Sequence, residues 1–151
     1  MIRRVDEIVI APATAIDVAT IKDILESNEL PTAGVDEHWR TFLVARDGQR
    51  IVGCCGAEAY PVAALIRSLA VAPQYRSHGI GRKLVRQLID RLASHGLREF
   101  YLLTTTAEPY FRKRGFKKID RDEVPPQLLQ SREFQDACPQ SAVCMRLAML
   151  S

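Results

Sequence analysis

A cluster of basic and polar residues surrounds two glycines near the middle of the chain. The segment RSHGIGR, residues 76–82, joins an apolar stretch that ends at Val71 to a stretch with helical spacing of its apolar residues. Glycines let a backbone turn sharply and approach a ligand closely. The first amides of a helix point outward at its positive end. The spacing therefore predicts that this turn binds a phosphate-bearing anion.

Two common phosphate-binding motifs do not fit these residues. A P-loop requires four residues between its first glycine and a Gly-Lys-Ser/Thr triplet, and a dinucleotide fingerprint requires a third glycine where Leu84 stands. The chain instead has the pattern R-x-x-G-x-G, from Arg76 to Gly81. We therefore expect the phosphate to lie on the backbone amides of the turn, beside Arg82.

A strand must lead into this turn and a helix must follow it. The segment 63–71, AALIRSLAV, has the length and apolar content of a strand. From Gly81 the pattern becomes helical, and Gly96 stands where a helix end favours a left-handed residue. The apolar stripe of this helix consists of Leu84, Val85, Leu88, Ile89 and Leu92.

The rest of the chain predicts an α/β protein, a mixed sheet covered by helices on both faces. The Asp47-Gly48 dipeptide between apolar runs indicates a hairpin, and Thr14 with Asp17 forms a capping-box variant that opens a helix. Thr106 is expected to cap a short helix. Outside the hairpin, the expected strands are 7–12, 63–71, 99–104, 116–119 and 141–150. This order fits one domain, residues 1–151.

The turn and its surroundings resemble the acyl-CoA-binding motif of the GNAT N-acetyltransferase superfamily. The pattern R-x-x-G-x-G, its LAVAPQYR prefix, the following helix and the later YFRKRGF carry the resemblance, which covers nearly the whole chain. It implies the GNAT fold, whose mostly antiparallel sheet is splayed open, and acetyl-CoA as co-substrate with no metal. The pyrophosphate would lie on the turn, and the pantetheine arm would pair with the preceding strand. The residues implied to bind this cofactor are Leu69, Ala70, Val71, Arg76, Ser77, His78, Gly79, Ile80, Gly81 and Arg82.

Acetyl transfer by direct attack needs a neutral amine, a polarised thioester and a proton for the leaving thiolate. Many GNAT enzymes donate this proton from a tyrosine four residues before the glycine of a terminal G-F pair. Phe111 occupies that position here and Tyr110 precedes it, about 100° away around a helix. Tyr110 is therefore either the general acid or an amphipathic tyrosine packed at the sheet edge.

The general base is left open, because the positions where many relatives carry a glutamate hold Leu65 and Thr104. The candidates are Glu58, the pair Glu37 and His38, and a water chain along the threonines 104–106. Among these threonines, Thr104 is the catalytic candidate and Thr105 the substrate-binding candidate.

Arg67 is the second substrate-binding candidate. Alternation along the strand places Leu65, Arg67, Leu69 and Val71 on one face, the face on which the family usually carries its acid. A guanidinium there either anchors a substrate carboxylate through a bidentate fork or forms a structural ion pair with Glu58 or Asp120.

Two narrower resemblances concern the acceptor. The segments YLLTTTAEPYFRKRGF and SAVCMRL resemble the acetyltransferase domain of N-acetylglutamate synthases. The combination of LPT, FLVA, LIRSLAV, YLLTTTA and SAVCM is similar to stand-alone ArsN-type acetyltransferases associated with arsenic resistance. They imply a small amino-acid-like amine as acceptor. The alternative is a non-catalytic acyl-CoA-binding sensor that retained the cofactor site.

Composition argues against several other partners. A net charge of +3 and an aromatic content of 7% that is not interleaved with basic residues disfavour nucleic-acid binding. No apolar run reaches the length of a membrane span and no signal peptide is visible, so a cytoplasmic protein without a membrane partner is expected. The apolar ending AVCMRLAML allows a homodimer.

The cysteines are predicted to be unbridged core residues and not metal ligands. No C-x-x-C spacing is present, and adjacent Cys54 and Cys55 should point to opposite faces of a strand. The other two are Cys138 and Cys144.

Overall fold

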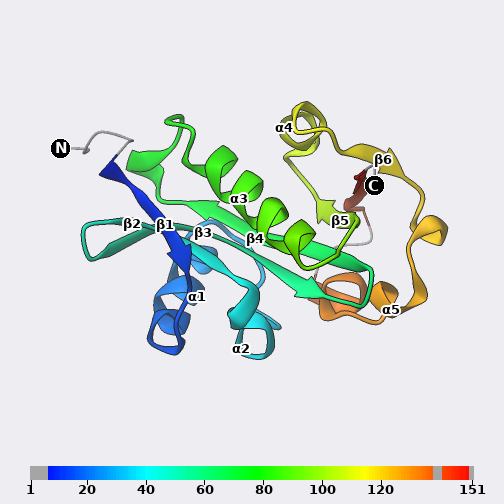
Figure 1. Cartoon of the computed structure of the whole chain (residues 1–151), viewed down its shortest axis with the longest axis horizontal. Helices are drawn as coiled ribbons and strands as arrows, with labels where there is room; N and C mark the ends of the chain where they lie inside the picture. Colours follow the sequence, from blue (N-terminus) through cyan, green and yellow to red (C-terminus); the bar gives the residue numbers. More distant parts are fainter. Residues whose placement is uncertain (1–6, 138–140, 150–151) are drawn as a thin grey trace.

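A seven-stranded sheet forms the centre of the protein, seen in a computed structural model that describes residues 7–137 and 141–149 (Figure 1). Its strand order is β1-β2-β3-β4-β5-β7-β6. The pairing of β4 with β5 is parallel and the other pairings are antiparallel. The strands are β1 (Val9–Pro12), β2 (Leu43–Asp47), β3 (Arg50–Ala59), β4 (Ala63–Val71), β5 (Glu99–Thr104), β6 (Lys117–Ile119) and β7 (Val143–Ala148). The predicted mixed sheet is confirmed.

Helices cover both faces of this sheet. In Figure 1, α1 and α2 lie on the face opposite to α3 and α4. The apolar stripe predicted for α3 is buried against the sheet, which explains its position. The helices are α1 (Val18–Ser27), α2 (Val35–His38), α3 (Ile80–Ser94), α4 (Glu108–Lys113) and α5 (Pro126–Leu129), and a single π-helical turn, η6, spans Glu133–Ala137.

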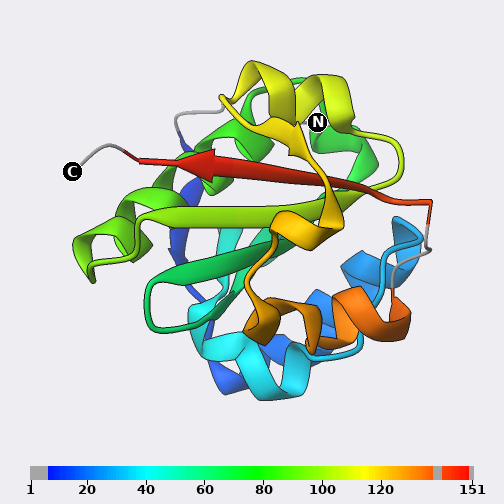
Figure 2. The ribbon, with the colours of Figure 1, turned by 90° about the vertical axis from the view of Figure 1, so that its right-hand side faces the viewer.

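The C-terminal strand is an interior strand of the sheet. Figure 2 shows β7 running beside β5, with the segment that contains β6 on its other side. Cys144 and Met145 of β7 are buried within the chain. The apolar ending of the sequence therefore has an explanation in the core of a single copy.

Most of the predicted turn chemistry is confirmed. The Asp17 carboxylate accepts the backbone N–H of Thr14 at 2.8 Å, as a capping box requires. The predicted hairpin is present, with its turn at Gly48 and Gln49 between the paired Asp47 and Arg50, and Gly96 has φ 94° after α3. The cap predicted at Thr106 is wrong: the helix N-cap is Ala107, whose N–H donates to Thr104 Oγ1 at 2.9 Å.

A β-bulge in β4 interrupts the alternation of its side chains. Cys54 pairs with Ala70 and Gly56 pairs with Arg67, so two residues of β4 oppose one residue of β3. Ser68, within the bulge, has φ 62°. The bulge therefore reverses the facing of every later residue on the strand.

This reversal corrects the predicted shared face. Leu65 belongs to the core cluster beneath α5, whereas Leu69 and Val71 pack with Ile66 into the core beneath α3. The expectation that Leu65, Arg67, Leu69 and Val71 share one face holds only up to Arg67, because strict alternation assumes a regular strand.

After Leu65, just before the bulge, β4 and β5 diverge. Their parallel pairing is limited to Ala63–Leu65 against Glu99–Tyr101. The Ala72 N–H bonds the Val52 carbonyl at 2.8 Å, so by antiparallel alternation the backbone groups of Val71 point away from β3, toward the gap. The predicted splayed sheet is thus confirmed, with unpaired backbone along one side of β4.

Three cysteines are free, buried thiols: Cys54, Cys55 and Cys144. Cys54 and Cys55 belong to core clusters on opposite faces of the sheet, as predicted. Cys138 lies outside the described residues. Within the part of the chain that the structure describes, no helix is long and apolar enough to cross a membrane.

Candidate functional site

Two adjoining cavities open where β4 and β5 separate. The glycine-turn cavity, of about 820 Å³, lies against the start of α3, and the threonine cavity, of about 610 Å³, lies against the end of β5. Both are lined by Asn28, Leu69, Thr106 and Ala107. Ligands in the two cavities would therefore lie next to each other beside Leu69.

Nine of the ten predicted cofactor residues line the glycine-turn cavity. They are Leu69, Ala70, Val71, Arg76, Ser77, Gly79, Ile80, Gly81 and Arg82. His78 is exposed and is not among the lining residues.

The turn presents unpaired backbone amides to this cavity. The first backbone bond of α3 runs from Lys83 N–H to the Gly79 carbonyl at 3.1 Å, so the amides of residues 80–82 have no partner within the helix. Ser77 and Gly79 have φ 67° and 82°. A Cβ added to Gly79 would meet no atom within 4 Å, so the space above the turn is open. These features form an anion site at the positive end of a 15-residue helix.

Three arginines reinforce the positive potential of this cavity: Arg76, Arg82 and Arg114. Arg76 Nε donates to the Val71 carbonyl at 3.1 Å, and its Nη2 donates to Asn28 Oδ1. Arg76 therefore bridges the end of β4 and the end of α1 across the cavity.

Tyr110 lines the glycine-turn cavity, whereas Phe111 lines the threonine cavity. The two rings pack edge to face with centroids 5.2 Å apart. Burial raises the pKa of Tyr110, and the Arg114 guanidinium nearby opposes that rise. A Cβ on Gly81 would lie 3.2 Å from the Tyr110 hydroxyl, so the missing side chain makes room for it.

Two buried polar atoms beside this cavity have no hydrogen-bond partner among the described residues: Tyr110 Oη and Arg114 Nε. Buried polar groups in proteins are nearly always satisfied. A ligand in the glycine-turn cavity would supply the missing partners.

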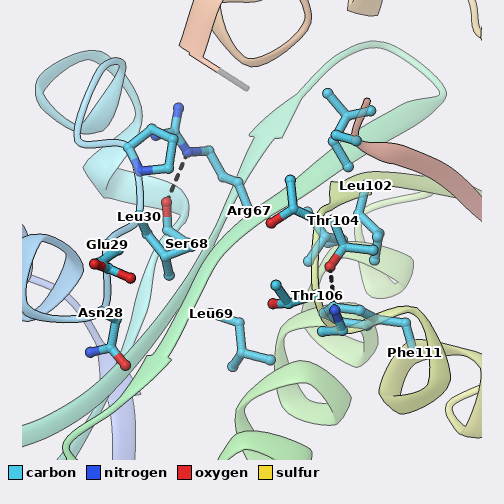
Figure 3. A pocket seen from close by; sticks show the side chains of 16 residues that line it. Asn28, Glu29, Leu30, Arg67, Ser68, Leu69, Leu102, Thr104, Thr106 and Phe111 are labelled. Atoms are coloured by element: carbon cyan, nitrogen blue, oxygen red, sulfur yellow. Dashed lines mark hydrogen bonds between the residues drawn. The ribbon is translucent and has the colours of Figure 1, made fainter. Parts of the chain in front are cut away.

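The threonine cavity combines hydroxyl groups with apolar walls. Thr104 and Thr105, both predicted site residues, line it together with Thr106 and Ser68 (Figure 3). Thr104 Oγ1 already accepts the Ala107 N–H, which leaves the hydroxyl hydrogen to donate to a ligand. The apolar walls include Leu30, Leu102 and Phe111.

Arg67 lines the threonine cavity, and its guanidinium is ion-paired with two carboxylates, although Nη2 makes no hydrogen bond among the described residues. Nη1 lies 2.8 Å from Glu58 Oε2, Nη2 lies 3.2 Å from Glu133 Oε1, and Nε donates to Ser68 Oγ at 2.9 Å. Arg67, Glu58 and Glu133 are all buried. The structural ion pair considered from the sequence is thus present with Glu58, and its further partner is Glu133 and not Asp120.

Glu58, a predicted catalytic base, lines neither cavity. Tyr60 Oη donates to its Oε1 at 3.2 Å, and His38 Nε2 lies 3.5 Å from the same oxygen. Burial and the nearby Glu58 carboxylate raise the pKa of Tyr60 to about 12. Glu58 is therefore placed behind the cavity wall, where its direct contacts are Arg67, His38 and Tyr60.

The sequence interpretation missed the end of α1. Asn28, Glu29, Leu30 and Pro31 all line the threonine cavity, and Asn28 also lines the other one. Only the LPT segment, quoted for its resemblance, pointed to this region. The contact arises because α1 crosses the sheet and ends over the gap beside β4.

The fold and the paired cavities define a protein with an arginine-lined cavity at the start of α3 and a second cavity, lined by hydroxyl groups, next to it. The chain belongs to the GNAT acetyltransferase family. The family model for the acetyltransferase (GNAT) domain matches residues 38–118. An N-acetyltransferase of Chlorobaculum tepidum is 35% identical over 117 residues, covering 76% of this chain and 72% of that protein.

More distant relatives and solved structures agree with this assignment. The amino-acid acetyltransferase of Pseudomonas aeruginosa strain LESB58 is 33% identical over 97 residues, which cover 62% of this chain but only 22% of that protein. The structure of N-acetylglutamate synthase from Neisseria gonorrhoeae, solved with coenzyme A and N-acetyl-glutamate, has a TM-score of 0.82 at 20% identity, over 95% of this chain and 35% of the other. A Mycobacterium tuberculosis protein, whose structure was solved with CoA, has a TM-score of 0.78 at 24% identity. The match covers 94% of this chain and 99% of that protein.

Proposed function

We propose that the protein is an acetyl-CoA-dependent N-acetyltransferase that transfers the acetyl group by direct attack to the amine of a small amino-acid-like substrate. The observation that carries this proposal is the meeting of two chemically different cavities beside Leu69. One cavity has a helix start and arginines suited to phosphates, and the other has hydroxyl groups suited to a small polar acceptor.

The donor occupies the glycine-turn cavity in this proposal. Its pyrophosphate lies on the amides of residues 80–82, with Arg76 and Arg82 beside it. Its pantetheine arm pairs with the backbone of Leu69 and Val71, which faces the gap. Since Arg76 Nε bonds the Val71 carbonyl, we expect this side chain to turn toward phosphate when the donor binds.

The acetyl carbonyl then lies between the cavities, where the amine attacks its carbon. The carbon–nitrogen bond forms and the carbon–sulfur bond breaks. The amine proton passes to water beside the threonines 104–106, and the thiolate of CoA takes up a proton from a general acid. A free backbone N–H of Leu69 or Val71 stabilises the developing oxyanion. Tyr110 is the proposed proton donor to the thiolate, because burial keeps its hydroxyl protonated and its hydrogen has no other acceptor among the described residues.

The acceptor occupies the threonine cavity, with Thr104 and Thr105 as hydrogen-bonding partners. The relatives named amino-acid acetyltransferases support an amino-acid-like amine. The similarity to ArsN-type enzymes extends the proposal to arsenic-containing amino-acid analogues. Arg67 contributes to acceptor binding mainly by fixing Ser68 and the cavity wall, since both of its terminal nitrogens are paired.

The test combines donor binding with turnover. Calorimetry should detect CoA binding, and a thiol-release assay with acetyl-CoA should find turnover with at least one amino acid, amino-acid amide or arsenic-containing analogue. An absence of both CoA binding and thiol release would refute the proposal. CoA binding without release from any amine would instead support the non-catalytic sensor.

The expected homodimer and cytoplasmic location stay predictions. Sedimentation velocity of the full chain distinguishes a dimer from a monomer. Because β7 is used inside the sheet, a dimer has to form through another surface.

A further inference from the structure

Glu29 occupies an unusual backbone position at the end of α1. Its N–H bonds the Glu26 carbonyl at 3.1 Å, and the Leu30 N–H bonds the Leu25 carbonyl at 2.9 Å. These two bonds form a Schellman motif, and Glu29, at its left-handed position, has φ 58°.

Local stability does not explain a glutamate at this position. Glycine, or sometimes asparagine, is preferred there, because a Cβ is strained at positive φ. A carboxylate also sits unfavourably at the negative end of a helix. Among the described residues, Glu29 has no ion-pair partner that would offset either cost. A residue that breaks two local rules without local compensation is often a functional residue.

The side chain of Glu29 borders the acceptor site. It lines the threonine cavity from the end of α1, next to Asn28, and lies on the other side of β4 from Thr104 and Thr106 in the view of Figure 3. Ser68, another residue with positive φ, lines the same cavity. Of the three described non-glycine residues with positive φ, Glu29 and Ser68 thus line this cavity, and Ser77 lines the glycine-turn cavity.

The charged residues that line this cavity differ in whether they have an ion-pair partner. Arg67 and Glu29 are the two charged side chains that line it. Arg67 is neutralised by Glu58 at 2.8 Å and Glu133 at 3.2 Å, both buried. The unpaired charge that an acceptor meets among the described lining residues is thus the Glu29 carboxylate.

We infer that Glu29 determines acceptor specificity: its carboxylate binds the acceptor in its protonated, ammonium form, before the amine loses its proton and attacks, and disfavours acceptors with an acidic side chain. This inference rests on the proposed function and narrows its substrate class. The acceptor is an amino-acid-like amine without a second carboxylate. A charge-assisted hydrogen bond of this kind is worth more than a neutral one.

The test measures acceptor binding without turnover. The full chain is saturated with CoA, which carries no acetyl group, and is titrated calorimetrically with L-leucinamide, a cation, and with L-glutamate, a net anion. The wild type should bind leucinamide more tightly than glutamate. Glu29→Gln should weaken leucinamide binding about tenfold, which corresponds to about 1.4 kcal/mol, and should strengthen glutamate binding.

Glu26→Gln is the matched control, because Glu26 is an exposed residue of the same helix that lines neither cavity. It should leave both affinities unchanged. The inference is overturned if the wild type does not prefer leucinamide, if neither probe binds, or if both variants change binding equally. The two proposals can fail separately. If Glu29→Gln loses the preference for leucinamide but the wild type releases no thiol with any amine, the proposed function is refuted and this inference on binding is kept.

Discussion

Three residues of this protein adopt conformations or environments that are unfavourable for folding, and all three line one of the two cavities. Glu29 and Ser68 both adopt positive φ without being glycine, and both line the threonine cavity. Tyr110 has a buried hydroxyl with no hydrogen-bond partner among the described residues and lines the other cavity. Each is costly for folding alone, which is expected where a ligand completes the arrangement.

The cost at Glu29 can be measured. Replacing Glu29 by glycine should raise the free energy of unfolding by about 1 kcal/mol, because the left-handed backbone is no longer strained. Glu26→Gly, three residues earlier within α1, should lower it, since glycine disfavours a helix. Urea denaturation of both variants checks this. A decrease in both would show that Glu29 is not strained.

Tyr110→Phe tests the proposed proton donor. The pKa of Tyr110 is raised by burial, so the hydroxyl stays protonated through neutral pH and can donate to the thiolate. We expect kcat to fall about a hundredfold, the lower end for general acid catalysis, while CoA affinity changes little. Tyr60→Phe is the control, because Tyr60 lines neither cavity. An unchanged kcat in Tyr110→Phe would leave Tyr110 as a packing residue.

At the level of elements, the glycine turn and the bulge of β4 create the site together. The turn aims the start of α3 at the cavity, and the bulge reverses the facing of Leu69. The gap itself begins where the pairing of β4 with β5 ends, at Leu65.

Gly79→Ala should weaken CoA binding about tenfold, because the left-handed turn that aims the amides becomes strained. Gly96→Ala is matched, since Gly96 has φ 94° and open space at the other end of the same helix. Gly96→Ala should lower the free energy of unfolding by about as much as Gly79→Ala does, but it should leave the affinity for CoA unchanged. Calorimetry and thermal unfolding of both variants separate the two effects, and equal affinities would contradict a phosphate site at the turn.

Arg67 joins three elements, β3, β4 and η6, through its two carboxylate partners. Arg67→Met should lower the free energy of unfolding by about 3–5 kcal/mol, because the buried Glu58 and Glu133 lose the guanidinium that both of them contact. Adding Glu58→Gln and Glu133→Gln should recover much of this loss. If the triple variant is no more stable than the single one, packing and not charge explains the role of Arg67.

At the scale of the whole molecule, buried thiols and phenols make stability depend on pH. Burial raises the pKa of Cys54 from 9.0 to about 12 and that of Cys144 to about 11. Because the folded-state pKa is raised, the folded protein retains protons that the unfolded chain loses above pH 9. The contribution of these thiols to the free energy of unfolding is fully present below about pH 9 and is lost as the pH rises toward about 12.

We therefore expect the free energy of unfolding to fall between pH 9 and pH 12, by up to about 1.4 kcal/mol per pH unit for each such group. Cys54→Ala should show a shallower decline, measured by urea denaturation at each pH. Parallel curves for this variant and the wild type would show that the Cys54 thiol does not contribute.

The sequence alone determined the order of elements and most of the residues that line the glycine-turn cavity. Strand 63–71, the turn at residues 76–82 and the apolar stripe of α3 are local patterns, in which periodicity and glycine placement suffice. The anion site follows from them, because its donors are backbone amides at a helix start.

Only the tertiary structure decided the acceptor side. The bulge at Ser68 places Leu69 and Val71 on the face opposite to the one that strict alternation predicts. Arg67 forms an ion pair with Glu133, which is distant in the sequence. Glu29 reached the cavity because α1 ends over the gap beside β4. These side chains come from separate elements whose meeting depends on packing, and no local pattern encodes which distant residues share a cavity.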